Sequence, residues 1–175
     1  QKGNIAQTDY FKKGFITIQD ESSQLVAPLL APKENEHVLD MCGAPGSKTT
    51  HLAQLMNNTG TIDVYDLYEH KIKLIEKNCQ RLGVTNVRTH IYDATLLDEI
   101  YQAKTFDRIL LDAPCSGLGV LKRKPEIKFH SSSIMDELIP LQTKLLEKAY
   151  YLLKNNGTMV YSTCTINKKE NDFMI

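Results

Sequence analysis

Two cysteines that follow apolar strand patterns, Cys115 and Cys164, are the residues best suited to do chemistry. The stretch "FDRILLDAPCSG" (106–117) ends on Asp112-Ala-Pro-Cys115, and "GTMVYSTC" (157–164) ends on Cys164. A thiolate can add to C6 of a pyrimidine and make C5 nucleophilic enough to accept a methyl group, while an acid offsets the charge on the ring. Two thiols beside Asp112 favour this covalent catalysis, although either cysteine could be a small buried hydrophobe.

The other two cysteines, Cys42 and Cys79, give weaker indications of a chemical role. Cys42 lies in a glycine-rich turn, where it could contact a cofactor or pack, and Cys79 lies on the apolar face of a helical pattern, where we expect it in the core. The four cysteines form no C-x-x-C pair. This spacing favours reduced thiols in a cytoplasmic protein over disulfides or a metal site.

Strand and helix patterns alternate along the chain. Strands are predicted over 37–41, 60–66, 86–93, 106–113 and 157–164, and helices over 20–31, 46–58, 68–84, 95–102 and 133–157, with Pro140 breaking or kinking the last one and a long loop from 113 to about 132. This alternation predicts an α/β fold with a doubly wound, mostly parallel sheet and helices on both of its faces.

The length fits one domain. We expect residues 1–35 to form an extension that packs on a catalytic domain over 36–175. The chain has no initial methionine and stops within a helical pattern, so we expect a piece of a longer protein whose C-terminal strands are missing. No apolar run approaches the roughly 20 residues of a membrane span.

In such sheets the ligand binds at the carboxyl ends of the strands. The first turn, "DMCGAPGSKT", is neither a Walker A loop nor a G-x-G-x-x-G turn, which argues against nucleoside triphosphates and dinucleotides. Asp66 ends the second strand, where a carboxylate can bind a ribose diol, and Asp93 ends the third. This pattern favours S-adenosylmethionine, although Asp66 could instead cap the next helix and Asp93 could be a turn residue.

Three blocks of the sequence resemble a known family. "VLDMCGAPGSKTTHLA", "DAPCSGLGVLKRKPEIK" and "YSTCTINKKEN" resemble the signature blocks of the Nol/Nop/Sun-type RNA cytosine-5 methyltransferases, and "FITIQDESSQLVAPLL" matches the block that precedes the cofactor loop in the bacterial Sun/Fmu-type members. The resemblance covers residues 10–175 and implies a Rossmann-like, class I methyltransferase fold. It also implies methylation of C5 of a cytosine in small-subunit (16S) ribosomal RNA.

The resemblance assigns roles to single residues. Cys164 would be the nucleophile that attacks C6, Cys115 would help the product to leave, and Asp112 would contact the cytosine and position the methyl donor. The cofactor contacts of the family fall on Cys42, Gly43, Ala44, Pro45, Gly46, Lys48, Asp66, Asp93 and Asp112. Ser47 departs from the family, because many members carry a second glycine there.

A basic loop follows the Pro-Cys turn and could bind RNA phosphates or simply be solvated. Its cations are Lys122, Arg123, Lys124 and Lys128. The formal net charge is zero, so bulk charge argues neither for nor against nucleic acid. We expect a monomer that binds RNA. The alternatives are an RNA-binding module without activity, a transfer RNA methyltransferase, and a methyltransferase for proteins or small molecules.

Overall fold

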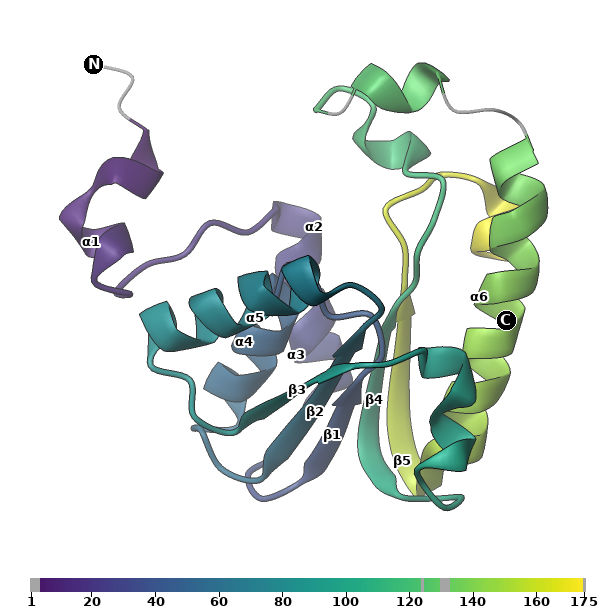
Figure 1. The fold of residues 1–175 in the computed structure, drawn as a ribbon, viewed down its shortest axis with the longest axis horizontal. Coiled ribbons are helices and arrows are strands. Elements are labelled where there is room, and N and C mark those ends of the chain that lie inside the picture. Colours follow the sequence, from purple (N-terminus) through teal and green to yellow (C-terminus); the bar gives the residue numbers. More distant parts are fainter. Residues whose placement is uncertain (1–3, 124, 130–132, 175) are drawn as a thin grey trace.

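The protein is built around one parallel sheet. The computed structural model describes residues 4–123, 125–129 and 133–174. Five strands lie in the order β3-β2-β1-β4-β5, and every pair of neighbours is parallel (Figure 1). The strands are β1 (His37–Asp40), β2 (Thr61–Asp66), β3 (Val87–Ile91), β4 (Phe106–Asp112) and β5 (Leu153–Ser162). The predicted α/β class and its five strands are confirmed.

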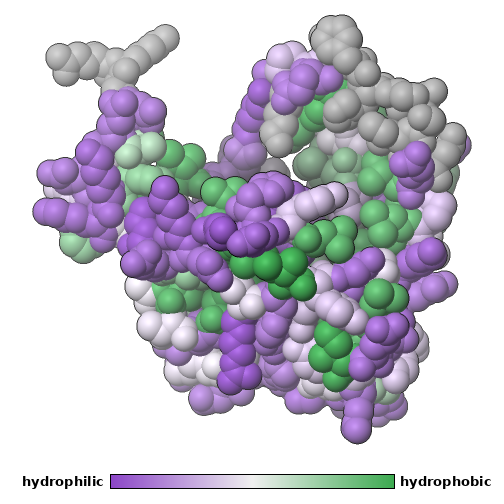
Figure 2. Space-filling view, in the orientation of Figure 1, coloured by the Kyte–Doolittle hydropathy of each residue, from purple (hydrophilic) through white to green (hydrophobic). Residues whose placement is uncertain are grey.

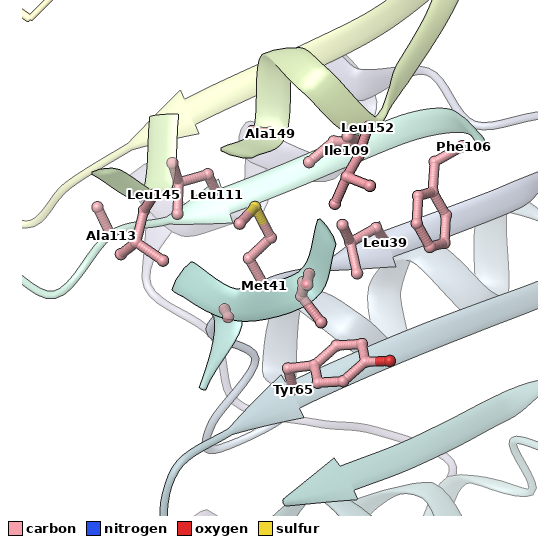
Figure 3. Packing of buried hydrophobic residues seen from close by; sticks show 12 residues of the cluster. Leu39, Met41, Tyr65, Phe106, Ile109, Leu111, Ala113, Leu145, Ala149 and Leu152 are labelled. Carbon is pink, nitrogen blue, oxygen red and sulfur yellow. The ribbon is translucent and has the colours of Figure 1, made fainter. Parts of the chain in front are cut away.

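Helices cover both faces of the sheet. One face packs against α3 (Val26–Leu30), α4 (Ser47–Leu55) and α5 (Glu69–Leu82), and the other packs against η2 (Ala94–Glu99) and α6 (Ser133–Leu152). Successive strand residues point to opposite faces. Val38 therefore packs in the α3–α4 layer, while Leu39 joins Ile109 and Leu111 in the α6 layer (Figure 3). Burial on both faces explains why the central strands are continuous apolar runs.

The last helix ends earlier than the sequence predicts. α6 continues through Pro140, where a break or kink was predicted, but it stops at Leu152 instead of residue 157, and β5 begins at Leu153. Leu153 pairs with Phe106 of β4, and the register shifts between Phe106 and Arg108. The strand ladder thus recruits residues that local propensity assigns to the helix.

Short helices replace one longer predicted helix and also occur within the predicted loop. The predicted helix over 20–31 is two helices, α2 (Glu21–Gln24) and α3. The predicted long loop contains η3 (Leu118–Val120) and η4 (Pro125–Phe129), and the remaining short elements are η1 (Ile5–Gln7), α1 (Asp9–Lys12) and η5 (Lys168–Glu170). No helix of the described residues has the length and apolar character to cross a membrane.

The N-terminal segment is attached to α5 by one arginine. Arg81 donates hydrogen bonds to the carbonyl oxygens of Phe11 (2.9 Å) and Ile16 (3.1 Å), and its guanidinium lies 3.9 Å from the centroid of the Phe11 ring. Farther along, Leu30 of α3 is fully buried against the sheet. The division into an extension and a domain at residue 35 stays a prediction.

All five strands end at the same edge of the sheet. In Figure 1 the loops after β4 and β5 rise together above this edge, and Figure 2 shows a hollow on the same face between the N-terminal side and the loop after β4. The turn after β1, Asp66, Asp93, Asp112 and the two cysteine loops therefore meet around this edge.

Candidate functional site

The turn between β1 and α4 needs its two glycines. A Cβ on Gly43 would lie 2.1 Å from Cγ2 of Val64. Gly46 has a φ of +97°, and a Cβ there would lie 3.0 Å from the Cα of Ile75. Neither the space nor the backbone angle suits another residue. The turn consequently lies close to β2 and α5, and its outer side borders a cavity.

That cavity, here the cofactor cavity, has a volume of about 390 Å³. It is lined by the turn residues Cys42 and Ala44, by the strand ends Asp66, Asp93 and Asp112, by Tyr68 and Lys71, and by both thiols, Cys115 and Cys164. This volume lies within the usual range for small-molecule sites. A glycine turn with two carboxylates beyond it fits the uncharged ribose and adenine of S-adenosylmethionine, since the cavity offers acceptors and no cluster of cations for a diphosphate.

Two of the three carboxylates that line the cofactor cavity, Asp66 and Asp93, already have partners. Asp66 does not cap α5, because Tyr68 precedes that helix; Asp66 Oδ1 accepts a hydrogen bond from the Tyr68 amide (3.2 Å) and lies 3.5 Å from Lys71 Nζ. Asp93 caps η2, because its Oδ1 accepts hydrogen bonds from the amide and hydroxyl of Thr95 (2.9 and 2.8 Å). Both residues hold turns through Oδ1, and Oδ2 of each has no hydrogen-bond partner among the described residues. Their roles as ligand contacts stay predictions.

Asp112 is held from two sides. Its Oδ2 accepts a hydrogen bond from Lys48 Nζ (2.7 Å), which comes from the first turn of α4, and its Oδ1 accepts one from the Ser162 hydroxyl (2.7 Å) at the end of β5. The side chain of Lys48 is 16% exposed and that of Asp112 is 29% exposed. A partly buried ion pair with a second donor fixes the carboxylate in one orientation. Sequence reasoning placed Lys48 near the cofactor but missed this pairing.

The two candidate thiols touch. The Sγ atoms of Cys115 and Cys164 are 3.2 Å apart, and the backbone N–H of Cys164 donates to Cys115 Sγ (3.2 Å). The hydrogen bond between the sulfurs and burial raise the pKa of Cys115 well above its usual range. Because the half-buried Cys115 therefore keeps its proton, its S–H can donate to Cys164, which is the more exposed of the two thiols.

A second cavity lies on the other side of Asp112 and Cys164. This cavity, here the substrate cavity, has a volume of about 340 Å³ and is lined by Lys48, Asp112 and Cys164 together with Ser22 and Ser23 of α2. Both cavities thus share a wall made of Asp112 and Cys164. The contribution of α2 was missed, since "DESSQ" indicates only a helix start in the sequence.

Asp40, at the end of β1, is a buried acid that the sequence analysis did not single out. It is fully buried, and Oδ2 accepts a hydrogen bond from the Thr49 hydroxyl (2.6 Å), while Oδ1 has no partner among the described residues. Burial raises its pKa to about 7, with a smaller contribution from Asp112, although Thr49 and Lys48 oppose the shift. Asp40 can therefore change protonation near neutral pH at the base of the site.

Glu170 is a second missed residue. It is fully buried, and its carboxylate accepts four hydrogen bonds. Two come from the backbone N–H (2.9 Å) and the hydroxyl (2.5 Å) of Ser116, and two come from the side-chain amides of Gln142 and Asn167 (3.0 Å each). Burial alone would raise its pKa, but these bonds outweigh burial and lower it. The Ser116 hydroxyl also lies 2.8 Å from that of Thr165. Ser116 and Thr165 directly follow the two cysteines, so Glu170 connects both thiol loops.

The basic loop is only partly described. Lys122 and Arg123 are exposed, and Arg123 forms an ion pair with Asp20 at the start of α2. Lys124 lies outside the described residues, as does the side chain of Lys128. The pairing with Asp20 bridges the loop after β4 to the segment that borders the substrate cavity.

Other cavities of similar or larger size lack this chemistry. One of about 490 Å³ lies between the N-terminal segment and α4, and one of about 610 Å³ lies between α6 and β5. Neither contains a thiol. Within the described part of the chain, no group of three or more His, Cys, Asp or Glu is arranged to hold a metal ion.

Solved structures with a similar fold include a methyltransferase homolog. A methyltransferase homolog protein from Pyrococcus horikoshii matches 99% of this chain and 54% of its own with a TM-score of 0.87 at 39% identity. NSun6 from Pyrococcus horikoshii, solved with SFG, matches 98% of this chain and 44% of its own with a TM-score of 0.89 at 35% identity. The parallel sheet, its strand order and the glycine turn after β1 define the chain as a Rossmann-like methyltransferase fold.

The sequence comparisons specify the family. The family described as 16S rRNA methyltransferase RsmB/F matches residues 27–175. The probable ribosomal RNA small subunit methyltransferase B of Bacillus subtilis is 47% identical over 175 residues, which cover 99% of this chain and 39% of that protein. The chain belongs to the RsmB/F methyltransferase family, which confirms the resemblance seen in its sequence blocks. It spans 39% of the length of this curated relative.

Proposed function

We propose that the protein methylates C5 of a cytosine in small-subunit (16S) ribosomal RNA, with S-adenosylmethionine as the methyl donor and a covalent bond between Cys164 and C6 of the base. The observation that carries this proposal is the wall shared by two cavities. Asp112 and Cys164 border both, so a donor in the cofactor cavity and a base in the substrate cavity would meet across them. The names of the relatives favour ribosomal over transfer RNA.

The proposed chemistry begins at Cys164. Its thiolate adds to C6, and Asp112, entering the step as the acid at the N3 edge, donates a hydrogen bond to N3 that offsets the charge on the ring. C5 thereby becomes an enamine carbon. Bound S-adenosylmethionine supplies the methyl group. A base then removes the C5 proton, the C5=C6 double bond forms again, and the bond between C6 and Cys164 breaks with the sulfur as leaving group. Cys115, whose sulfur lies 3.2 Å away, is positioned to donate its proton to the departing Cys164 sulfur and so to assist release of the product.

Around this centre the remaining predicted residues bind ligands. Asp66 and Asp93 accept hydrogen bonds from the cofactor, and the turn from Cys42 to Gly46 lies against it. The cations Lys122, Arg123, Lys124 and Lys128 hold RNA phosphates, and the target base is flipped out of its stack to reach Asp112 and Cys164. We further propose a cytoplasmic monomer, with residues 1–35 as an extension on the catalytic domain.

The test is mechanism-based trapping. The complete gene product is incubated with S-adenosylmethionine and small-subunit ribosomal RNA that carries 5-fluorocytosine, in which fluorine at C5 blocks the final elimination. We expect a covalent protein–RNA complex on a denaturing gel. Cys164→Ser should abolish it, whereas Cys115→Ser should accumulate a complex even with ordinary cytosine.

Each result has a contrary outcome. A Cys164→Ser variant that still forms the adduct refutes the nucleophile assignment, and a Cys115→Ser variant without accumulation refutes the release role. Cys79→Ser is the matched control, because that buried thiol packs with Ile72 and Ile75, away from both cavities. If transfer RNA forms the adduct and ribosomal RNA does not, the proposed ribosomal substrate is wrong. If the protein binds RNA but forms no adduct, the result supports the alternative of an RNA-binding module without activity.

A further inference from the structure

The contact between Cys115 and Cys164 has a second chemical consequence. A disulfide joins sulfurs about 2.04 Å apart, and these two sulfurs are already 3.2 Å apart in direct contact. They lie on loops that follow neighbouring parallel strands, since Asp112 of β4 pairs with Ser162 of β5. Closing the remaining gap therefore requires about 1 Å of side-chain movement rather than a rearrangement of the sheet.

The two thiols also differ in the way that disulfide formation requires. Cys164 is exposed, whereas Cys115 is half-buried and lies behind it in contact. An exposed thiol with thiolate character reacts first with an oxidant, and a neighbouring thiol resolves the product. Cys164 fits the first role and Cys115 fits the second.

We propose that Cys115 and Cys164 are a modification site at which a peroxide forms a reversible intramolecular disulfide. The Cys164 thiolate attacks hydrogen peroxide, breaks the O–O bond and becomes a sulfenic acid, while the released hydroxide takes up a proton to give water. The Cys115 sulfur then attacks the Cys164 sulfur, its proton and the hydroxyl leave as a second water, and the S–S bond forms. The peroxide accepts the two electrons that the thiols lose, and a small dithiol returns them.

Oxidation removes both thiols from the site at once. If the function proposed above holds, on which this consequence rests, the disulfide stops methylation and protects Cys164 from irreversible oxidation to sulfinic acid. Cys42 and Cys79 provide internal controls. Burial raises the pKa of the Cys79 thiol to about 11, and burial and nearby carboxylates raise that of Cys42 well above its usual range.

The experiment counts and maps thiols without any need for activity. The complete gene product is treated with hydrogen peroxide, unfolded, alkylated without reductant, and digested for mass spectrometry. We expect a cross-linked peptide pair that contains Cys115 and Cys164, with loss of two hydrogens in mass, while Cys42 and Cys79 remain alkylated. Dithiothreitol should restore alkylation at both linked positions. Cys115→Ser and Cys164→Ser should each abolish the link, and Cys79→Ser should leave it unchanged.

Two outcomes would overturn the proposal. One is sulfinic or sulfonic acid at Cys164 with Cys115 still alkylated, and the other is a link that uses Cys42 or joins two chains. The failure of this inference differs from a failure of the proposed function. Reduced protein that traps 5-fluorocytosine RNA but never forms the link refutes only the disulfide, whereas protein that forms the link but never traps RNA refutes only the function.

Discussion

Glu170 offers the sharpest test of how the fold positions the two thiols. In Glu170→Ala, the buried backbone N–H of Ser116 loses its acceptor, which costs about 1–3 kcal/mol. The Ser116 hydroxyl keeps the Thr165 hydroxyl as a hydrogen-bond partner, and the side-chain amide of Gln142 still donates to the Pro114 carbonyl oxygen (2.8 Å). The loss of the bond from each of these two groups to Glu170 therefore costs only about 1 kcal/mol. With the space left by the side chain, we expect a loss of about 3–5 kcal/mol in the free energy of unfolding.

Glu170→Gln separates the charge from the volume. Its amide oxygen can still accept from the Ser116 and Gln142 amides, and the Ser116 hydroxyl can rotate to accept from the new NH₂ group. The Asn167 amide then faces a second donor. We expect a smaller loss of about 1–2 kcal/mol, because one of the four bonds becomes repulsive and the others lose their charge assistance.

The assay is urea denaturation, combined with the rate of 5-fluorocytosine trapping. Since Ser116 and Thr165 follow the two cysteines, Glu170→Gln should slow trapping in protein that is still folded. Glu69→Gln is the matched control, because its ion pair with Lys73 is solvent-exposed and should change neither measurement. If Glu170→Ala loses less than about 1 kcal/mol, or if it matches Glu170→Gln in both assays, the argument from buried hydrogen bonds is refuted.

Three further predictions follow from single side chains. Because the pKa of Asp40 is raised to about 7, the free energy of unfolding should fall as pH rises from about 4 to 7. By urea denaturation, Asp40→Asn should remove that fall and be more stable than the wild type at pH 8. An equal dependence of the free energy of unfolding on pH in both proteins would contradict this prediction. Asp66→Asn keeps the bond from Tyr68 but loses the charge, so calorimetry should show S-adenosylmethionine binding weakened by roughly 1–3 kcal/mol; unchanged affinity would limit Asp66 to the turn. Lys122→Gln should reduce the salt dependence of RNA binding by about one counterion, and an unchanged slope would place Lys122 off the RNA.

The sequence was sufficient for the sheet and for the edge at which the strand-end acids and the two cysteine loops gather. Apolar runs such as that of β4 are long and bounded by turn residues, so their existence and order can be predicted locally. The contact between Cys115 and Cys164 follows in outline, because neighbouring parallel strands end at one edge. The distance between their sulfurs does not follow, since it depends on the Glu170 network, in which Glu170 accepts a hydrogen bond from Ser116, 54 residues away in the chain.

The errors have a common physical cause. Leu153 and the residues after it resemble a continuing helix, but pairing with β4 draws them into β5. "NKKEN" resembles a helix start, yet it forms the short η5, in which Glu170 turns inward to Ser116. In both places tertiary hydrogen bonds override local propensity. The ion pair of Lys48 with Asp112 was missed for the same reason, since it joins residues 64 positions apart, and the role of Lys48 beside the cofactor stays a prediction.

Asp112 differs from the other strand-end carboxylates because it belongs to both cavities. A carboxylate oxygen has room for more than one hydrogen bond, so Asp112 can keep Lys48 and Ser162 and still accept an N–H from a ligand on either side. Its two partners come from α4 and from the end of β5, and therefore its position depends on both flanking elements. Loss of Asp112 should consequently weaken cofactor and RNA together, whereas loss of Asp66, which borders one cavity, should weaken the cofactor alone.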